Sequence, residues 1–142
     1  MNAATQLTAA LAAEHAAVYG YGVLGSRLEG TALEAARSAE AAHRERRDAL
    51  VVRLTAAGAT PPPAEPVYAP PSPVTDRATA LALAVGIEER AAQAWRAALP
   101  VTEGEERRLA LDALVDTAQR AARWRRVGGV SPSVVAFPGR PA

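Results

Sequence analysis

The feature that most constrains the fold is a helical pattern between residues 33 and 54 with ionisable groups on its apolar face. Side chains that recur at three- and four-residue steps lie on one side of an α-helix. Here they are Leu33, Ala36, Glu40, His43, Arg47, Leu50 and Leu54. Charged groups are rare in protein interiors unless they are paired, so this side of the helix must meet complementary groups on other helices.

Composition favours an all-helical domain. The chain has 142 residues, enough for one domain, and 49% of them are hydrophobic although only 4% are aromatic. Most of the hydrophobic residues are alanine, which is the strongest helix former and is rare in strands. There is no cysteine, which excludes a disulfide framework, a thiolate metal site and a cysteine nucleophile.

Charge and hydropathy narrow the range of partners. The formal net charge is +1, so nothing favours a nucleic acid or a membrane surface as the partner. The sequence has no apolar run long enough for a membrane span and no recognisable signal peptide. We therefore expect a cytoplasmic protein.

Helix signals divide the chain into two helical hairpins. We expect helices at about residues 2–29, 31–57, 76–99 and 102–127, in one bundle domain of residues 1–129. The segment 59–75 contains seven prolines, which predict an extended crossover between the second and third helices. Residues 130–142 form a proline-containing C-terminal tail. The expected fold is an antiparallel four-helix bundle with this long crossover.

Local motifs support these boundaries. Thr31-x-x-Glu34 and Thr102-x-x-Glu105 have the pattern of capping boxes at the second and fourth helices. Residues 20–25 spell G-x-G-x-x-G, but no strand precedes them, as a dinucleotide site requires. We interpret these glycines as points where a neighbouring helix approaches closely. His15 points away from the apolar stripe of its helix and is expected at the surface or edge.

Three of the expected helices bring one glutamate to the centre of an apolar stripe. They are Glu14, Glu40 and Glu88, and His43 accompanies the second in a Glu-x-x-His pair. A carboxylate and an imidazole three residues apart point the same way and could hold one metal ion. Carboxylate-bridged di-metal proteins use one Glu from each of two helices and a Glu-x-x-His from each of the other two.

This order of residues resembles the ferritin-like superfamily, and within it a group of small actinobacterial ferritin-like domains of unknown function. The segments EHAAVYGYG and AEAAHRERRD and the proline-rich crossover carry the resemblance, which extends over residues 2 to about 127. It implies a four-helix bundle, commonly dimeric, with any site between the helices. It also implies iron or manganese as the metal, with Glu14, Glu40, His43 and Glu88 as the ligands.

The fourth helix departs from this pattern. Its nearest counterpart of a second Glu-x-x-His is Asp116-x-x-Gln119. Asp116 lies off the stripe set by Leu111 and Leu114, aspartate is shorter than glutamate, and Gln119 is a poor ligand. A complete di-iron centre is therefore not expected.

The same residues permit a metal-free interpretation, which we rank first. Arg47 and Arg125 lie on the predicted inner faces of their helices and could hold the carboxylates by bidentate hydrogen bonds. The site would then be a polar network that fixes how the helices pair, with one metal ion as the second alternative and a di-metal centre as the third.

The metal-free and metal-binding interpretations of the site predict different functions. The first is a non-catalytic ferritin-like domain, at most weakly metal-binding, that acts through association as a homodimer. The alternative is an enzyme, namely an iron- or manganese-dependent oxidoreductase or peroxide-handling protein.

Overall fold

The computed structural model describes residues 2–141, which form four long α-helices. They are α1 (Ala3–Gly25), α2 (Gly30–Ala56), α3 (Arg77–Ala98) and α4 (Gly104–Val127), with a short 3-10 turn, η1 (Leu99–Val101), before α4. No strand occurs within this described part of the chain. The prediction of an all-α fold with four helices is confirmed. None of these helices combines the length and hydropathy that a membrane span requires.

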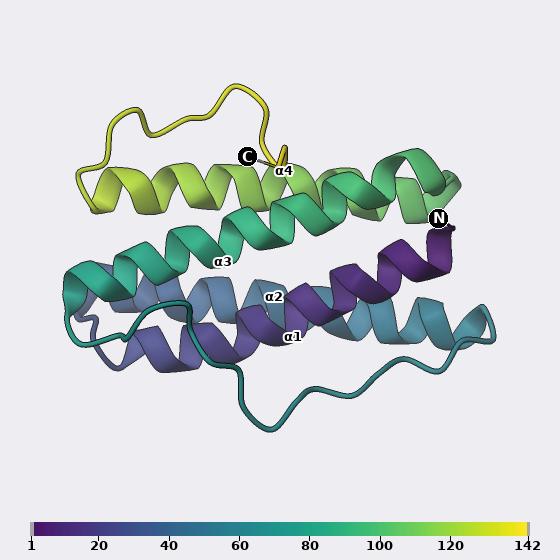
Figure 1. The fold of residues 1–142 in the computed structure, drawn as a ribbon, viewed down its shortest axis with the longest axis horizontal. Helices are drawn as coiled ribbons and strands as arrows, with labels where there is room; N and C mark the ends of the chain where they lie inside the picture. Colours follow the sequence, from purple (N-terminus) through teal and green to yellow (C-terminus); the bar gives the residue numbers. More distant parts are fainter. Residues whose placement is uncertain (1, 142) are drawn as a thin grey trace.

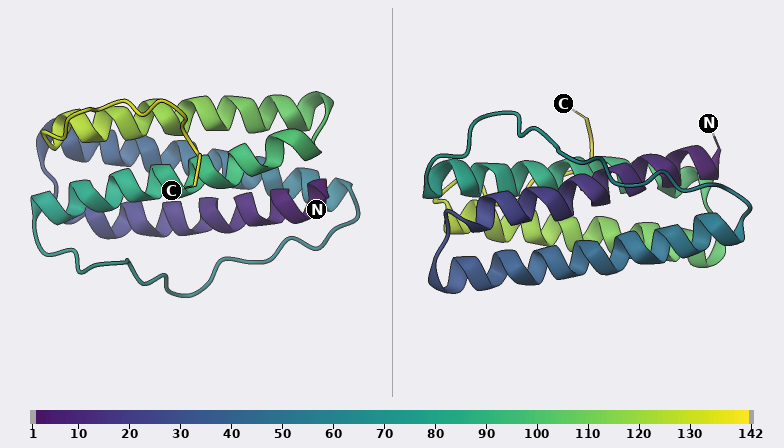
Figure 2. Two further views of the ribbon diagram at one scale, coloured as in Figure 1. Left: turned by 45° about the horizontal axis from the view of Figure 1, so that its top comes forward. Right: turned by 90° about the horizontal axis from the view of Figure 1, so that it is seen from below.

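The helices form one elongated bundle (Figure 1). The main helix contacts are those of α1 with α2, α1 with α3, and α3 with α4, whereas α2 and α4 barely touch. Short turns separate α1 from α2 and α3 from α4, so the chain reverses at each. The segment 57–76 returns along the outside of the bundle from the end of α2 to the start of α3 (Figures 1 and 2).

The apolar core is divided into two clusters. One cluster contains Tyr21, Leu24, Ile87 and Trp124 with several alanines, and the other contains Leu7, Leu11, Leu50, Leu54 and Trp95. The buried charged residues Glu14, His43 and Glu88 belong to neither cluster. The bundle is thus apolar towards both ends and charged in its middle.

Alanines, not leucines, form much of the buried helix surface. On α4 the buried side chains include Ala110, Ala113 and Ala121, whereas Leu111 is 49% and Val115 46% exposed. Small residues face the neighbouring helices because they allow close approach. The predicted inner stripe of α4 is therefore wrong at Leu111 and Val115, whereas Arg125, which was also predicted on the inner face, is buried.

The inner face of the second helix is partly as predicted, since Ala36, His43, Leu50 and Leu54 are buried. Its buried residues are Ala32, Ala36, Ala39, His43, Leu50 and Leu54. Glu40 and Arg47, placed on this face by the sequence pattern, are only partly buried. Ala39 takes the inner position that we assigned to Glu40. The two residues are adjacent in the chain, so their side chains point about 100° apart around the helix.

Both capping boxes predicted from the sequence, at the starts of α2 and α4, are absent. The residues preceding α2 and α4 are Glu29 and Glu103, and neither makes a side-chain capping hydrogen bond. Thr102 is buried instead, and its hydroxyl donates to the Ala98 carbonyl at 2.8 Å, at the end of α3. A capping box does occur at α3, between Asp76 and Thr79.

One glycine of the G-x-G-x-x-G segment, Gly20, lies where α1 and α3 approach each other closely. A Cβ atom on Gly20 would lie 2.6 Å from Cδ1 of Ile87 on α3, so only glycine fits without movement of that side chain. Nothing lies within 4 Å of the corresponding position on Gly22. The interpretation of close helix approach therefore holds for Gly20 and not for Gly22.

The crossover is held to α1 by two contacts. The Nε2 atom of His15 donates to the Pro62 carbonyl at 3.1 Å, and the rings of Tyr19 and Tyr68 have centroids 5.6 Å apart. His15 is 8% exposed, so its predicted surface position is wrong. The crossover covers this side chain, which a helix pattern cannot show.

Candidate functional site

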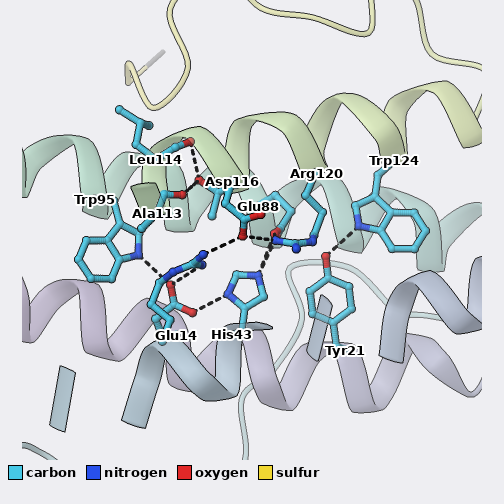
Figure 3. Close-up of polar contacts among 12 residues, drawn as sticks. Glu14, Tyr21, His43, Glu88, Trp95, Ala113, Leu114, Asp116, Arg120 and Trp124 are labelled. Atoms are coloured by element: carbon cyan, nitrogen blue, oxygen red, sulfur yellow. Dashed lines mark hydrogen bonds and ion pairs between the residues drawn. The ribbon is translucent and has the colours of Figure 1, made fainter. Parts of the chain in front are cut away.

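A buried histidine joins three helices at the centre of the bundle (Figure 3). His43 of α2 places Nδ1 2.5 Å from Oε2 of Glu14 on α1. Its other ring nitrogen, Nε2, lies 2.7 and 2.8 Å from the two carboxylate oxygens of Glu88 on α3. All three side chains are fully buried, with 0% exposure.

This geometry requires a protonated imidazole. A carboxylate oxygen accepts hydrogen bonds, so two carboxylates on opposite sides of the ring are both satisfied only if both ring nitrogens carry hydrogen. Burial by itself lowers the pKa of His43, but the hydrogen bonds to Glu14 and Glu88 outweigh it and raise that pKa to about 9. His43 is therefore an imidazolium at neutral pH.

The Glu14 carboxylate has two further donors. Nε1 of Trp95 donates to Oε1 of Glu14 at 2.7 Å, and an Arg46 guanidinium nitrogen lies 3.4 Å from the same oxygen. Burial raises the pKa of Glu14, but His43, Arg46 and Trp95 together lower it below its ordinary value. Each hydrogen-bonding oxygen of this buried carboxylate is thus matched by donors.

A second set of charges connects this centre to α4. Asp116 of α4 accepts from Arg46 at 2.7 Å and from Arg120 at 2.6 Å, and Arg120 lies 3.5 Å from Glu88. Burial raises the pKa of Asp116, but the two arginines lower it overall. The network therefore contains three carboxylates and three cations, and its net charge is zero when His43 is protonated.

Aromatic side chains form one boundary of the network. The ring of Tyr21 stacks on His43 with centroids 5.7 Å apart and an interplanar angle of 24°. Its hydroxyl accepts from Nε1 of Trp124 at 2.8 Å. Burial and the nearby Glu88 carboxylate raise the pKa of Tyr21 well above its ordinary value, so this hydroxyl stays neutral.

The structure brings together some of the predicted site residues. Glu14, His43 and Glu88 converge as described, and Asp116 joins them only through Arg46 and Arg120. In contrast, Glu40 does not reach the centre, because its carboxylate pairs with Arg44 at 2.5 Å on the outer side of α2. Gln119 is exposed on α4.

The two arginines predicted to hold the carboxylates are not the ones that do so. Arg47 pairs with the adjacent Asp48, and Arg125 pairs with Glu89 near the tail. Their places are taken by Arg46 and Arg120, whose side chains are 11% and 12% exposed. The sequence does contain a feature that could have identified Arg46 as a site residue. It follows His43 by three residues, which puts both side chains on one side of α2.

The acidic and histidine side chains of the described chain do not form a metal-binding cluster. Within residues 2–141, no group of three or more His, Asp or Glu side chains is arranged to hold a metal ion. Both nitrogens of His43 face carboxylates, so neither has a lone pair available.

We predict that Glu14 and Glu40 differ strongly in their contribution to stability. Glu14→Gln leaves His43 and Arg46 with one fewer buried anion and should lower the free energy of unfolding by about 3 kcal/mol or more. Glu40→Gln removes only a partly exposed i,i+4 pair and should cost about 0.5 kcal/mol or less. Urea denaturation of both variants measures this difference, and equal losses would contradict the network described.

The free energy of unfolding should decrease both at alkaline pH, where His43 loses its proton, and at acidic pH, where Glu14 gains one. The pKa of His43 is raised from 6.5 to about 9, so its contribution of about 3 kcal/mol is complete below pH 6.5 and is lost as the pH rises through about 9. The pKa of Glu14 is lowered from 4.5, so its contribution is complete above that pH and is lost at more acidic pH. Unfolding at a series of pH values should show a maximum near pH 5 to 7, and constant stability from pH 7 to 10 would disprove the His43 assignment.

Comparison with known proteins identifies relatives without a described activity. The model of the family described as "Domain of unknown function (DUF4439)" matches residues 6–142. The crystal structure of a conserved hypothetical protein, rv2844, from Mycobacterium tuberculosis is similar, with 40% identity and a TM-score of 0.84 over 87% of this chain and 94% of that chain. No curated protein matches. The chain belongs to the DUF4439 family of domains of unknown function.

Proposed function

We propose that this protein is a ferritin-like four-helix bundle in which a charge network takes the place of a metal centre. In this proposal the domain is not an enzyme and acts by association with a second copy of itself. The single observation that carries the first part is the contact of both His43 nitrogens with carboxylates. A metal ligand must offer a lone pair, and this imidazolium offers none.

The donor set also fails to fit the di-metal arrangement of ferritin-like proteins. Glu14 and Glu88 correspond to the single glutamates of two helices, but Glu40 pairs with Arg44, outside the centre. The fourth helix contributes Asp116, which two guanidinium groups already hold. Those groups, from Arg46 and Arg120, also lie within 3.5 Å of the Glu14 and Glu88 carboxylates and would repel a divalent cation there.

Metal analysis tests the first part of the proposal. Protein purified without chelator and supplied with iron or manganese should retain no stoichiometric metal after desalting, because its own cations neutralise the carboxylates. His43→Ala and the control His15→Ala, which alters a histidine outside the network, should behave alike. One or two ions per chain, lost in His43→Ala and kept in His15→Ala, would instead support an iron- or manganese-dependent oxidoreductase or peroxide-handling enzyme.

The outer side of α4 supports the association part of the proposal. Leu111 and Val115 are four residues apart, so they share one side of the helix, and both are about half exposed. Neither belongs to the core clusters, whose α4 members are alanines and Trp124, with the partly buried Leu109 and Leu114 packed against them. Adjacent exposed apolar side chains on one helix are typical of a contact surface.

Charges on α4 favour a second copy as the partner. Glu105 and Arg123 are exposed and 18 residues apart, which is about five turns, so they lie on the same side of the helix. Their midpoint along the helix axis is level with Leu111 and Val115, and both charges lie about 100° around the helix from these two residues, at the edge of the contact face. Two α4 helices packed antiparallel about this midpoint would place Glu105 of each copy beside Arg123 of the other, as a two-fold interface requires.

Oligomeric state tests the association. We expect a dimer in sedimentation analysis and a melting temperature that rises with protein concentration. Val115→Glu should produce a monomer by placing a charge in the apolar contact. The matched control is Val52→Glu, which makes the same change at an exposed valine on α2 and should leave the dimer intact. A wild-type protein that is monomeric at high micromolar concentration would contradict this part of the proposal.

A further inference from the structure

The crossover and the helices beneath it enclose a groove that the central network does not use. It consists of two hollows, of about 290 and 420 Å³, which share Pro71 of the crossover and Leu83 and Arg90 of α3. The first hollow is also lined by α1, and the second extends along α3 beside Gly86. These volumes are in the range of sites for small organic molecules.

The wall of the first hollow is apolar and aromatic. Val23 of α1, Ile87 of α3 and Pro70 of the crossover contribute aliphatic surface. Tyr19 and Tyr68 line it too, and their contact joins the crossover to α1. An apolar molecule placed here would be covered on one side by helices and on the other by the crossover.

Arg90 is the only charged residue that lines either hollow, as far as the described residues show. Its side chain is exposed, and within residues 2–141 its guanidinium forms no ion pair or hydrogen bond, while the adjacent Glu89 pairs with Arg125. The guanidinium lies over Gly86, where an added Cβ atom would be 3.0 Å from one of its nitrogens. The absence of a side chain at residue 86 thus gives the cation room beside the groove.

We propose that this groove binds an apolar monocarboxylate. The carboxylate of the ligand accepts hydrogen bonds from the guanidinium fork of Arg90, and the apolar part of the ligand lies between the crossover and the helices. The groove offers one guanidinium, which pairs with one carboxylate through two parallel hydrogen bonds. Tyr19, whose hydroxyl has no hydrogen-bond partner within residues 2–141, lines the same hollow as Arg90.

Calorimetric titration with decanoate below its micelle concentration tests the charge contact. We expect saturable binding of about one decanoate per chain, and binding of decanol that is weaker by about tenfold or more because it lacks the carboxylate. Arg90→Gln should weaken decanoate binding by a similar factor. Arg37→Gln is the matched control, since it removes an exposed arginine from α2 and should not change the affinity.

Two further variants test the position of the ligand. Ala16→Phe narrows the first hollow and Ala82→Phe the second, and both positions are at least partly exposed, so the fold should tolerate them. At least one of the two should weaken decanoate binding. The proposal is wrong if wild-type protein does not bind decanoate. It is also wrong if Arg90→Gln binds as tightly as Arg37→Gln, or if neither phenylalanine affects the affinity.

Discussion

The contact of His43 with two carboxylates is the interaction on which the rest of the bundle depends. It joins α1, α2 and α3 in one layer, where all three side chains are fully buried. Burying a carboxylate or an imidazolium alone is costly, so each charge is tolerated only because the others are present. Since ion pairs require defined distances, this layer fixes the axial position of three helices more strictly than apolar packing between alanines can.

The fourth helix is attached to this layer through arginines. Helices α2 and α4 barely touch, and Arg46 of α2 spans the distance between them to reach Asp116. Arg120 then connects α4 to Glu88 on α3. Long guanidinium side chains thus supply the connection on the side of the bundle where the helix backbones are too far apart for close packing.

The sequence predicted the helices and part of the site, and the misplaced site residues share one cause. Glu14, His43 and Glu88 could be identified because each is an ionisable residue in the middle of an apolar stripe. Glu40 and Arg47 were misplaced because the stripe was drawn through the larger apolar residues, whereas Ala39 faces the core. A shift of one residue, about 100° on a helix, exchanges Arg47 for Arg46. The groove could not be predicted, since it depends on where the crossover lies.

The central charge network is separate from both surfaces that are proposed to bind a partner or ligand. Three cations from the chain already neutralise three carboxylates, and none of their hydrogen bonds reaches the exposed side of α4 or the groove under the crossover. Within residues 2–141, the side chains proposed to act at those surfaces, Val115 and Arg90, form no ion pair or hydrogen bond with the network. A buried network that is complete by itself can hold the bundle together while the surfaces change independently. In the function proposed above, the centre therefore serves as a structural element, and binding occurs at the surface.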